Sequence, residues 1–449
     1  MQKGFIFDIN HCTGCSACRL ACIIENDLEP GVAWREVHTF NPARIEGIPV
    51  FHHSLACNHC VDPPCLINCP ASAYTKDQNT GAVTIDEDAC IGCKYCSWAC
   101  PFDAPKLNPS TGVMEKCTLC EDRIDHGLAP ACVTLCPTGA LGFGDVEPGS
   151  HQHELGFPRS GVDAAIEFVP LDSNRHIPER SIDSSQPPGG LVNSFEIDGV
   201  ESKISLRSEW SLIVFSQVVA WLTGYILAVV VNKVPALPIV FAGLGIMGVV
   251  ASALHLGKRK RAMRALVNWR RSWLTREVIL TSLFLITGAV WLMIPGRGSV
   301  WGWVVVAVGF AGLFAMDRVY HVTGTEKLSL HSAQTIITGI YAGGVLGWSG
   351  GLLMAGAAAK LLLYGYRKHR RYNHGYDPRF GISALRIIMG LVAPVLFWLW
   401  QPGTIALAAI VFAAAGELID RVEFYAELYV TTPRRQLTLD LEKTITRGV

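Results

Sequence analysis

The stretch CIGCKYCSWACP, residues 90–101, places four cysteines within eleven positions and ends in a proline. The cysteines follow the spacing C-x2-C-x2-C-x3-C, and residues 12–22 repeat it. Two related quartets follow the spacings C-x2-C-x4-C-x3-C at 57–69 and C-x2-C-x11-C-x3-C at 117–136. The four quartets use all 16 cysteines of the protein, which indicates an internal repeat.

This spacing is typical of cysteines that hold pairs of [4Fe–4S] clusters. Three closely spaced thiolates surround one cluster, and the fourth, next to a proline that ends the local structure, reaches the other cluster. Zinc sites more often use two separated C-x2-C pairs, and disulfides are not favoured because MQKGFIFDIN, residues 1–10, lacks an export signal. We therefore expect cluster ligands at Cys12, Cys15, Cys18, Cys22, Cys57, Cys60, Cys65, Cys69, Cys90, Cys93, Cys96, Cys100, Cys117, Cys120, Cys132 and Cys136.

The composition of the chain changes after residue 208. Half of the 449 residues are hydrophobic and 17% are charged, and the formal net charge of zero gives no indication of nucleic-acid binding. Apolar stretches long enough to span, or nearly span, a bilayer run over 210–231, 236–256, 277–295, 299–318, 332–349, 351–366, 382–400 and 403–422. The sequence thus predicts an α+β, duplicated bacterial ferredoxin-like domain followed by an all-α bundle of about eight transmembrane helices.

These features predict four segments along the chain. They are a four-cluster domain over 1–145, a connector rich in Pro, Gly and Ser over 146–208, an anchor over 209–430 and a tail over 431–449. The loop between the second and third stretches, residues 257–277, carries eight Lys or Arg residues, and such loops lie on the cytoplasmic side. With an even number of spans, we expect a multi-pass protein of the cytoplasmic membrane whose cluster domain lies in the cytoplasm.

Ionisable side chains within membrane spans are costly and commonly functional. His255 ends the second stretch and Glu277 begins the third, so both are candidates for exchanging protons with a bound electron carrier. Histidine titrates near neutrality, and burial brings a carboxyl group into the same range. Arg318, Glu417 and Arg421 are further candidates for the pocket of that carrier.

Structural ion pairs are the alternative reading of these charges. Arg318 with Asp317, and Arg421 with Glu417, would then only join helices. The opposite half of the bundle contains almost no ionisable residue except Lys360, whose long side chain would reach back toward the charged half. Without a proton path across the membrane, we expect protons and electrons to be exchanged on the same side.

The four quartets resemble the electron-transfer subunit of the complex iron–sulfur molybdoenzymes, the family of dimethyl sulfoxide reductase, polysulfide reductase and respiratory nitrate reductase. The resemblance covers residues 1 to about 145 and implies four [4Fe–4S] clusters. It also implies that the first and fourth quartets exchange their last cysteines, as do the second and third. The implied ligand sets are Cys12, Cys15, Cys18 and Cys136; Cys117, Cys120, Cys132 and Cys22; Cys57, Cys60, Cys65 and Cys100; and Cys90, Cys93, Cys96 and Cys69.

Short segments after residue 210 resemble the membrane anchor of dimethyl sulfoxide reductase. They are ASALHLGKRKRAMRAL at 251–266, LTREV at 274–278, DRVY at 317–320 and AGELIDRVEFY at 415–425. The resemblance implies a quinone or menaquinone as the bound electron carrier and no haem. It also implies three partners, which are a molybdopterin-containing catalytic subunit, the membrane quinone pool and the lipid bilayer.

The sequence therefore predicts a fused electron-transfer and anchor subunit of an oxidoreductase complex, with substrate conversion on another chain. In the favoured direction, membrane quinol reduces the clusters, which pass electrons to a catalytic subunit of the dimethyl sulfoxide reductase type. In the reverse direction, the chain is the quinone-reducing arm of a cytoplasmic sulfite dehydrogenase. A membrane anchor that senses redox state without turnover is the alternative from another class.

Overall fold

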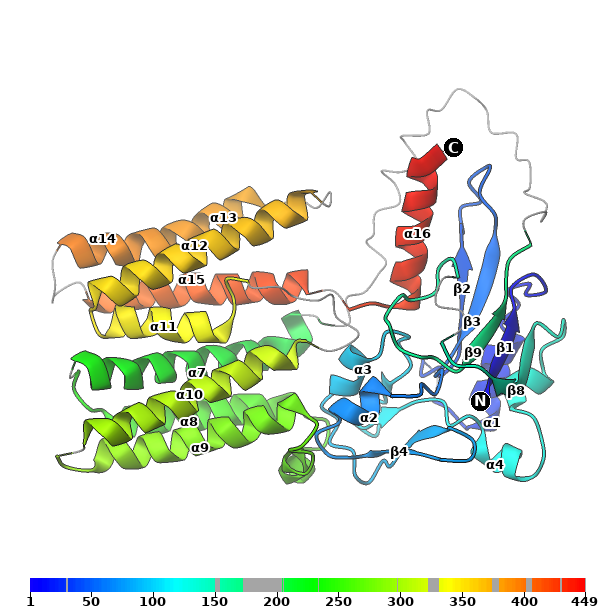
Figure 1. Ribbon diagram of the computed structural model, residues 1–449, viewed down its shortest axis with the longest axis horizontal. Coiled ribbons are helices and arrows are strands. Elements are labelled where there is room, and N and C mark those ends of the chain that lie inside the picture. Colours follow the sequence, from blue (N-terminus) through cyan, green and yellow to red (C-terminus); the bar gives the residue numbers. More distant parts are fainter. Residues whose placement is uncertain are drawn as a thin grey trace. The chain divides into compact units, whose positions relative to one another are not determined.

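The computed structural model describes residues 1–29, 31–149, 154–172, 204, 206–232, 234–296, 298–321, 331–373, 379–400, 406–428 and 430–448. The chain divides into two compact units. The first comprises Met1–Lys203, Val322–Glu326 and Tyr429–Val449, and the second comprises Ile204–His321 and Lys327–Leu428. Strands and short helices make up the first unit, and long helices make up the second (Figure 1).

The first unit contains a three-stranded sheet. Strand β1 (Gln2–Asp8) lies in the middle, antiparallel to β8 (Leu141–Val146) and parallel to β9 (Ile166–Val169). Buried aromatic residues of β1 and β9 pack edge to face, with the Phe7 and Phe168 rings 6.1 Å apart. Three antiparallel hairpins complete the strands: β2 (Glu36–Phe40) with β3 (Phe51–Leu55), β4 (Tyr74–Lys76) with β5 (Val83–Ile85), and β6 (Lys106–Leu107) with β7 (Met114–Glu115).

The four cysteine quartets share one local structure. The third cysteine of each quartet is the second residue of a short helix: α1 (Ala17–Glu25), α2 (Pro64–Asn68), α3 (Tyr95–Ala99) and α5 (Ala131–Thr134). The fifth short helix is α4 (Glu121–Asp125). The fourth cysteine follows the third by four residues, about one helical turn of 5.4 Å. Helix α1 packs against α5, and α2 against α3, which pairs the first quartet with the fourth and the second with the third.

The C-x2-C turns share a second feature that the sequence alone does not reveal. The residue before the second cysteine has a left-handed backbone in every quartet, with φ of 74° at Gly14, 40° at His59, 66° at Gly92 and 67° at Leu119. Glycine adopts this conformation without steric cost, whereas a side chain adds roughly 1–2 kcal/mol. The turn is therefore retained even at the two positions where glycine is absent.

Two segments join the first unit although the sequence placed them outside the cluster domain. Strand β9 belongs to the segment 146–208 that was expected to be a connector, most of which lies outside the described residues. Helix α16 (Pro433–Gly448) replaces the expected tail over 431–449, and its Leu437 and Leu441 are buried in the core of the first unit. The first unit thus extends beyond residue 145 and includes the C-terminal end of the chain.

Asp440 attaches α16 to the rest of the first unit. Its carboxylate is buried and accepts hydrogen bonds from the Gly156 N–H at 2.9 Å and from Gln436 at 3.0 Å. We predict that Asp440→Ala destabilises the first unit by roughly 1–3 kcal/mol, because the buried Gly156 N–H loses its acceptor. The temperature at which cluster absorbance bleaches should fall, whereas Glu442→Ala, on the exposed face of α16, should leave it unchanged.

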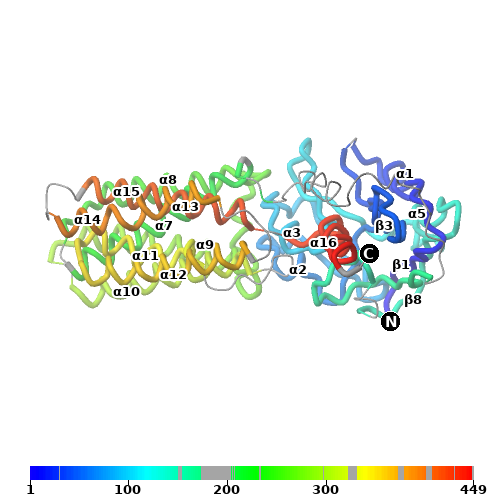
Figure 2. The backbone as a smooth tube through the Cα atoms, turned by 90° about the horizontal axis from the view of Figure 1, so that it is seen from above, coloured from blue at the N-terminus to red at the C-terminus, as the bar shows by residue number. Residues whose placement is uncertain are grey.

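The second unit consists of helices that run alongside one another (Figures 1 and 2). They are α7 (Leu206–Asn232), α8 (Pro238–Leu254), the 3-10 helix η2 (Arg259–Leu266), α9 (Trp273–Met293), α10 (Ser299–Val319), α11 (Thr335–Leu346), α12 (Gly350–Asn373), α13 (Phe380–Ile387), the π-helical segment η3 (Ile388–Val392), α14 (Ala393–Trp400) and α15 (Ala406–Glu427). Helix α10 packs most extensively on α9, and α11 on α7.

All eight predicted apolar stretches fall on helices, but a count of eight spans is not confirmed. Among the described residues, four helical segments are long and apolar enough to cross a membrane: Ser208–Val231, Trp273–Met293, Ser299–Val319 and Phe380–Trp400. Helix α8 together with η2 makes a fifth if the pair, bent by 104°, is counted as one span. Helix α11, at 12 residues, is only about 18 Å long, and α12 and α15 contain many ionisable residues.

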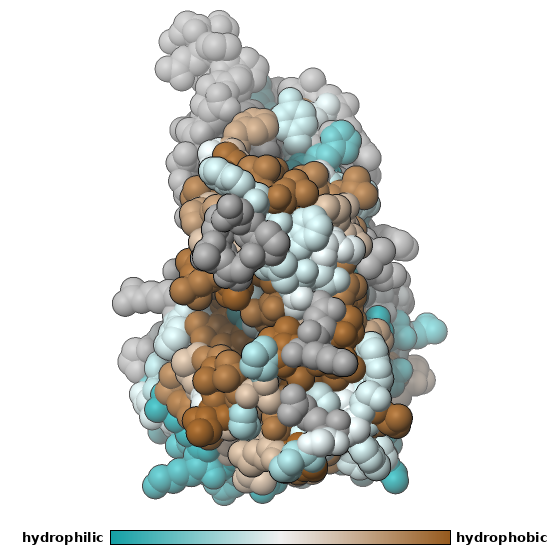
Figure 3. Space-filling view, turned by 90° about the vertical axis from the view of Figure 1, so that its left-hand side faces the viewer, coloured by the Kyte–Doolittle hydropathy of each residue, from teal (hydrophilic) through white to brown (hydrophobic). Residues whose placement is uncertain are grey.

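One end of the second unit presents an apolar surface (Figure 3). Large apolar side chains are exposed at helix ends of this unit, among them Ile239 at the start of α8, Trp301 at the start of α10 and Trp400 at the end of α14. Tryptophan is enriched where a membrane protein meets the interface between lipid and water. This surface is consistent with a membrane-integral unit.

Candidate functional site

Three hollows in the first unit are lined by cysteines from two quartets each. One, of about 310 Å³, is lined by Cys12, Cys15, Cys18 and Cys136. The second, of about 350 Å³, is lined by Cys57, Cys60, Cys65 and Cys100. The third, of about 280 Å³, is lined by Cys69, Cys90, Cys93 and Cys96. In each hollow the last cysteine of a quartet joins the first three cysteines of the partner quartet.

The remaining four cysteines also lie together. Cys22 interacts electrostatically with Cys132 and Cys120, and Cys117 interacts with Cys22 and Cys132. The packing of α1 on α5 brings them together, because α1 carries Cys22 and α5 carries Cys132. The folded chain thus groups its cysteines into the four sets that exchange last cysteines between quartets.

The chemistry of these sites fits iron–sulfur clusters. In the described residues, no three His, Cys, Asp or Glu side chains are grouped closely enough to hold a single metal ion. The cysteines instead line hollows, as expected when each thiolate binds a different iron of a cube. Burial raises the pKa of the Cys22 and Cys93 thiols to about 12, so these thiols stay protonated until iron displaces the proton.

A second group of functional side chains is buried in the helical unit around Glu277. This residue lies in α9 and interacts electrostatically with Arg421 of α15 and Asp317 of α10. The Arg421 guanidinium donates hydrogen bonds to Tyr320 OH at 3.2 Å, to Ala333 O at 2.8 Å and to Ser216 Oγ at 3.2 Å. Tyr320 OH is in turn hydrogen-bonded to Tyr425 OH. The group therefore combines a carboxyl group, a guanidinium and two phenols in a buried, partly aromatic environment.

Other predicted site residues have different roles from those expected. Asp317 does not pair with Arg318; its carboxylate accepts hydrogen bonds from Thr335 N–H at 2.8 Å and Ile336 N–H at 3.3 Å, at the start of α11. Arg318 is exposed and its guanidinium lies 5.4 Å from the centre of the Trp273 ring. His255 is half-buried and ends α8.

Glu417 also has partners other than the expected Arg421. Its carboxylate pairs with Lys360 Nζ at 2.6 Å and with Arg386 Nη2 at 3.3 Å. Lys360 is fully buried and donates two further hydrogen bonds, to Ser332 O at 2.7 Å and Thr338 Oγ1 at 3.0 Å. This contact agrees with the expectation that Lys360 reaches toward the charged half, because Glu417 is one of the residues assigned to that half.

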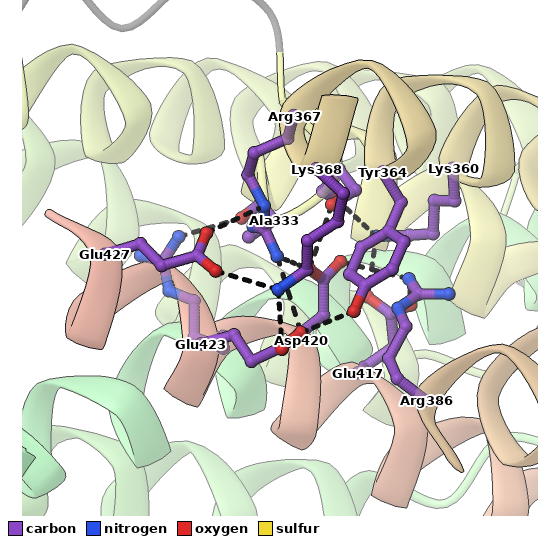
Figure 4. Close-up of polar contacts among 12 residues, drawn as sticks. Ala333, Lys360, Tyr364, Arg367, Lys368, Arg386, Glu417, Asp420, Glu423 and Glu427 are labelled. Atoms are coloured by element: carbon purple, nitrogen blue, oxygen red, sulfur yellow. Dashed lines mark hydrogen bonds and ion pairs between the residues drawn. The ribbon is translucent and has the colours of Figure 1, made fainter. Parts of the chain in front are cut away.

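These residues begin an ion network that joins α12, α13 and α15 (Figure 4). Arg386 bridges Glu417 to Asp420 at 3.0 Å, and Arg367 continues to Asp420 at 2.9 Å. Lys368 then joins Glu423 at 2.7 Å to Glu427 at 2.8 Å, and Tyr364 OH donates to Glu423 at 2.7 Å. We call the following set the α12–α15 ion network: Lys360, Tyr364, Arg367, Lys368, Arg386, Glu417, Asp420, Glu423 and Glu427.

Exposure rises along this network. The side chains of Lys360 and Glu417 are 0% and 1% exposed, whereas Lys368 and Glu427 reach 11% and 12%. The predicted apolar stretch 351–366 ended before Arg367 and Lys368, and sequence reasoning did not single out Glu423 or Glu427. The spacing of the charged residues along each helix could have revealed this network, because side chains three or four positions apart share one face of a helix.

Two family models match the chain. Residues 48–146 match a 4Fe-4S dicluster domain, and residues 209–374 match the DMSO reductase anchor subunit (DmsC). The two matches fall in different parts of the chain, one over the last three cysteine quartets and the other over helices α7 to α12 of the second unit.

Three curated relatives each match between 34% and 40% of the chain. The protein is 41% identical over 160 residues to the B chain of anaerobic dimethyl sulfoxide reductase from Escherichia coli K12, covering 34% of this chain and 78% of that protein. It is 36% identical over 201 residues to the B subunit of sulfite dehydrogenase from Allochromatium vinosum, covering 40% and 84%. It is 40% identical over 158 residues to the thiosulfate reductase electron transfer subunit PhsB of Salmonella typhi, covering 34% and 82%.

Proposed function

The protein belongs to the family of dimethyl sulfoxide reductase B chains, here fused to a membrane anchor of the DMSO reductase type, and from this premise we propose that it carries electrons between membrane quinol and a separate catalytic subunit. It is a non-catalytic subunit of an oxidoreductase complex, and the catalytic partner is a molybdopterin enzyme. The cluster domain lies on the cytoplasmic side of the membrane.

The grouping of the cysteines is the observation that carries this proposal. Every set has four thiols, drawn from the first three cysteines of one quartet and the last of another. Each set is complete, so each would hold a [4Fe–4S] cluster, which supplies one-electron transfer. Four adjacent clusters suit electron transport over a distance, whereas one would suffice for a redox sensor.

We place quinol oxidation at the buried group around Glu277. Oxidation of a quinol releases two electrons and two protons, so the site needs proton acceptors next to the hydroxyl groups. Glu277 is the acceptor at this site, and Arg421 and Tyr320 orient the carbonyl oxygens that form. His255, at the end of α8, is the second candidate acceptor.

The reverse direction is the second candidate function. The match to the sulfite dehydrogenase relative spans 201 residues, more than the 160 residues matched to the dimethyl sulfoxide reductase relative. In that direction electrons from sulfite oxidation would enter the clusters and reduce quinone at the Glu277 group.

The test follows the quinone pool in anaerobic membranes that contain the chain with its native partners. Adding dimethyl sulfoxide should oxidise quinol if the chain serves a reductase, and adding sulfite should reduce quinone if it serves a dehydrogenase. We predict that Glu277→Gln slows either reaction roughly 100-fold, the usual effect of removing a proton-transfer group. His255→Ala should also slow it.

The matched control is Arg370→Gln, because Arg370 is exposed on α12 and was not a candidate for the quinone pocket. This variant should keep nearly normal rates. Full activity of Glu277→Gln would place quinol elsewhere in the bundle. A quinone pool that responds to neither substrate, in membranes with intact clusters, would reject both substrate assignments.

A further inference from the structure

Two cationic side chains are enclosed among the cluster cysteines. Arg35 and Lys116 are each only 1% exposed. In the part of the chain that the structure describes, neither forms an ion pair with a carboxylate, and their strongest attractive interactions are with cysteines. A buried cation is costly without a compensating negative charge. The compensating charge must therefore come from thiolates and the anionic clusters that they hold.

Arg35 lies at the junction of two cysteine sets. Its Nη1 donates to Ser54 O at 3.0 Å and to Ser54 Oγ at 3.1 Å, and Ser54 Oγ is 3.1 Å from Cys18 Sγ. The guanidinium also lies 4.3 Å from the centre of the Phe5 ring, whereas Nη2 is buried without a hydrogen-bond partner. Its attractive interactions are with Cys132, Cys117, Cys18 and Cys22. Arg35 thus faces the Cys22–Cys117–Cys120–Cys132 set and the neighbouring set that contains Cys18.

Lys116 occupies the next junction. Its ammonium donates hydrogen bonds to Val83 O and, at 2.9 Å, to Cys117 O. It lines the hollow of the Cys57–Cys60–Cys65–Cys100 set, and its attractive interactions are with Cys57, Cys65 and Cys117. The two cations thus lie on either side of the set that contains Cys117.

We propose that Arg35 and Lys116 raise the reduction potentials of the clusters held by the Cys22–Cys117–Cys120–Cys132 set and the Cys57–Cys60–Cys65–Cys100 set, respectively. This inference rests on the proposed function. Reduction adds one electron to a cluster that is already an anion, and a fixed cation nearby favours the reduced state. Burial strengthens the effect, because little water screens the charge. The two residues act through the clusters, as tuning residues that make these two clusters easier to reduce.

The test is a potentiometric titration of the purified full-length chain, loaded with clusters, with dithionite as reductant and electron paramagnetic resonance as readout. Arg35→Met should make reduction of one cluster at least tenfold less favourable, a fall of about 59 mV for one electron. Lys116→Met should lower the reduction potential of a different cluster by a similar amount. Arg35→Lys retains the charge and should keep the native midpoints.

Arg44→Met is the matched control, since Arg44 is an exposed arginine of the same unit, and it should leave every midpoint unchanged. Unchanged midpoints in Arg35→Met, or an equal shift in Arg35→Lys, would overturn the inference. If Arg35→Met does not incorporate iron, Lys116→Met and Lys116→Arg make the same comparison. Iron analysis precedes each titration, so a native chain without clusters contradicts the proposed function, whereas loaded variants with native midpoints contradict only this inference.

Discussion

Glu417→Gln should destabilise the helical unit by about 3–5 kcal/mol, the usual cost of removing one partner of a buried ion pair. The change keeps the size of the side chain but removes the carboxylate that lies 2.6 Å from Lys360 Nζ. Arg386 retains Asp420 at 3.0 Å, whereas the fully buried Lys360 ammonium keeps only neutral acceptors, Ser332 O and Thr338 Oγ1. The loss of stability therefore comes from the buried Lys360 ammonium, which no longer has a carboxylate as its ion-pair partner.

The double variant Lys360→Met with Glu417→Gln removes both charges and should recover much of the loss. Unfolding of the purified protein in mixed micelles, titrated with a denaturing detergent, gives the four stabilities of a double-mutant cycle. Arg370→Gln serves as a control, since Arg370 lies on the exposed face of the same α12 helix as Lys360. If Glu417→Gln has nearly native stability, or the double variant is no better than the single one, the ion pair does not hold these helices together.

The sixteen cluster ligands could be predicted because cluster ligation is encoded in local spacing, whereas the grouping into four sets was implied by the resemblance to a known family. Each third cysteine occupies the second position of its helix, so the x3 spacing carries the fourth cysteine one turn further along the chain. The predicted end of the cluster domain at residue 145 nevertheless left out parts of the first unit. The pairing of β9 with β1 and the packing of Leu437 join segments far apart in sequence, and no local pattern encodes such contacts.

In the helical unit, sequence reasoning failed on the charged residues rather than on the position of the apolar helices. Each predicted apolar stretch lies on a helix, but the stretch 351–366 ended before the charges at 367–371, because hydropathy marks only the apolar part of a helix. Helix α12 continues to Asn373, and its Arg367 and Lys368 pair with Glu423 and Glu427 of α15. Partner choice among buried charges depends on how helices pack, so the alternative reading, which paired Arg318 with Asp317 and Arg421 with Glu417, did not identify their partners.

The exchange of last cysteines between quartets makes a specific prediction about the clusters. Cys60→Ser and Cys100→Ser should each damage the same cluster, although the two residues belong to different quartets, because both line one hollow. Cys93→Ser, which shares a quartet with Cys100, should damage a different cluster, because Cys93 lines the hollow of Cys69. Each single variant should lose about a quarter of the iron, or convert one cluster to a three-iron form.

Electron paramagnetic resonance of the dithionite-reduced protein identifies which signal each variant loses, and iron analysis gives the amount. The double variant Cys60→Ser with Cys100→Ser should lose no more than that one cluster, because both residues act on the same site. Combining Cys60→Ser with Cys93→Ser should lose two signals. If Cys100→Ser instead removed the signal lost in Cys93→Ser, each quartet would hold its own cluster. The hollows would then not mark the ligand sets, and the path proposed for electrons would have to be redrawn within single quartets.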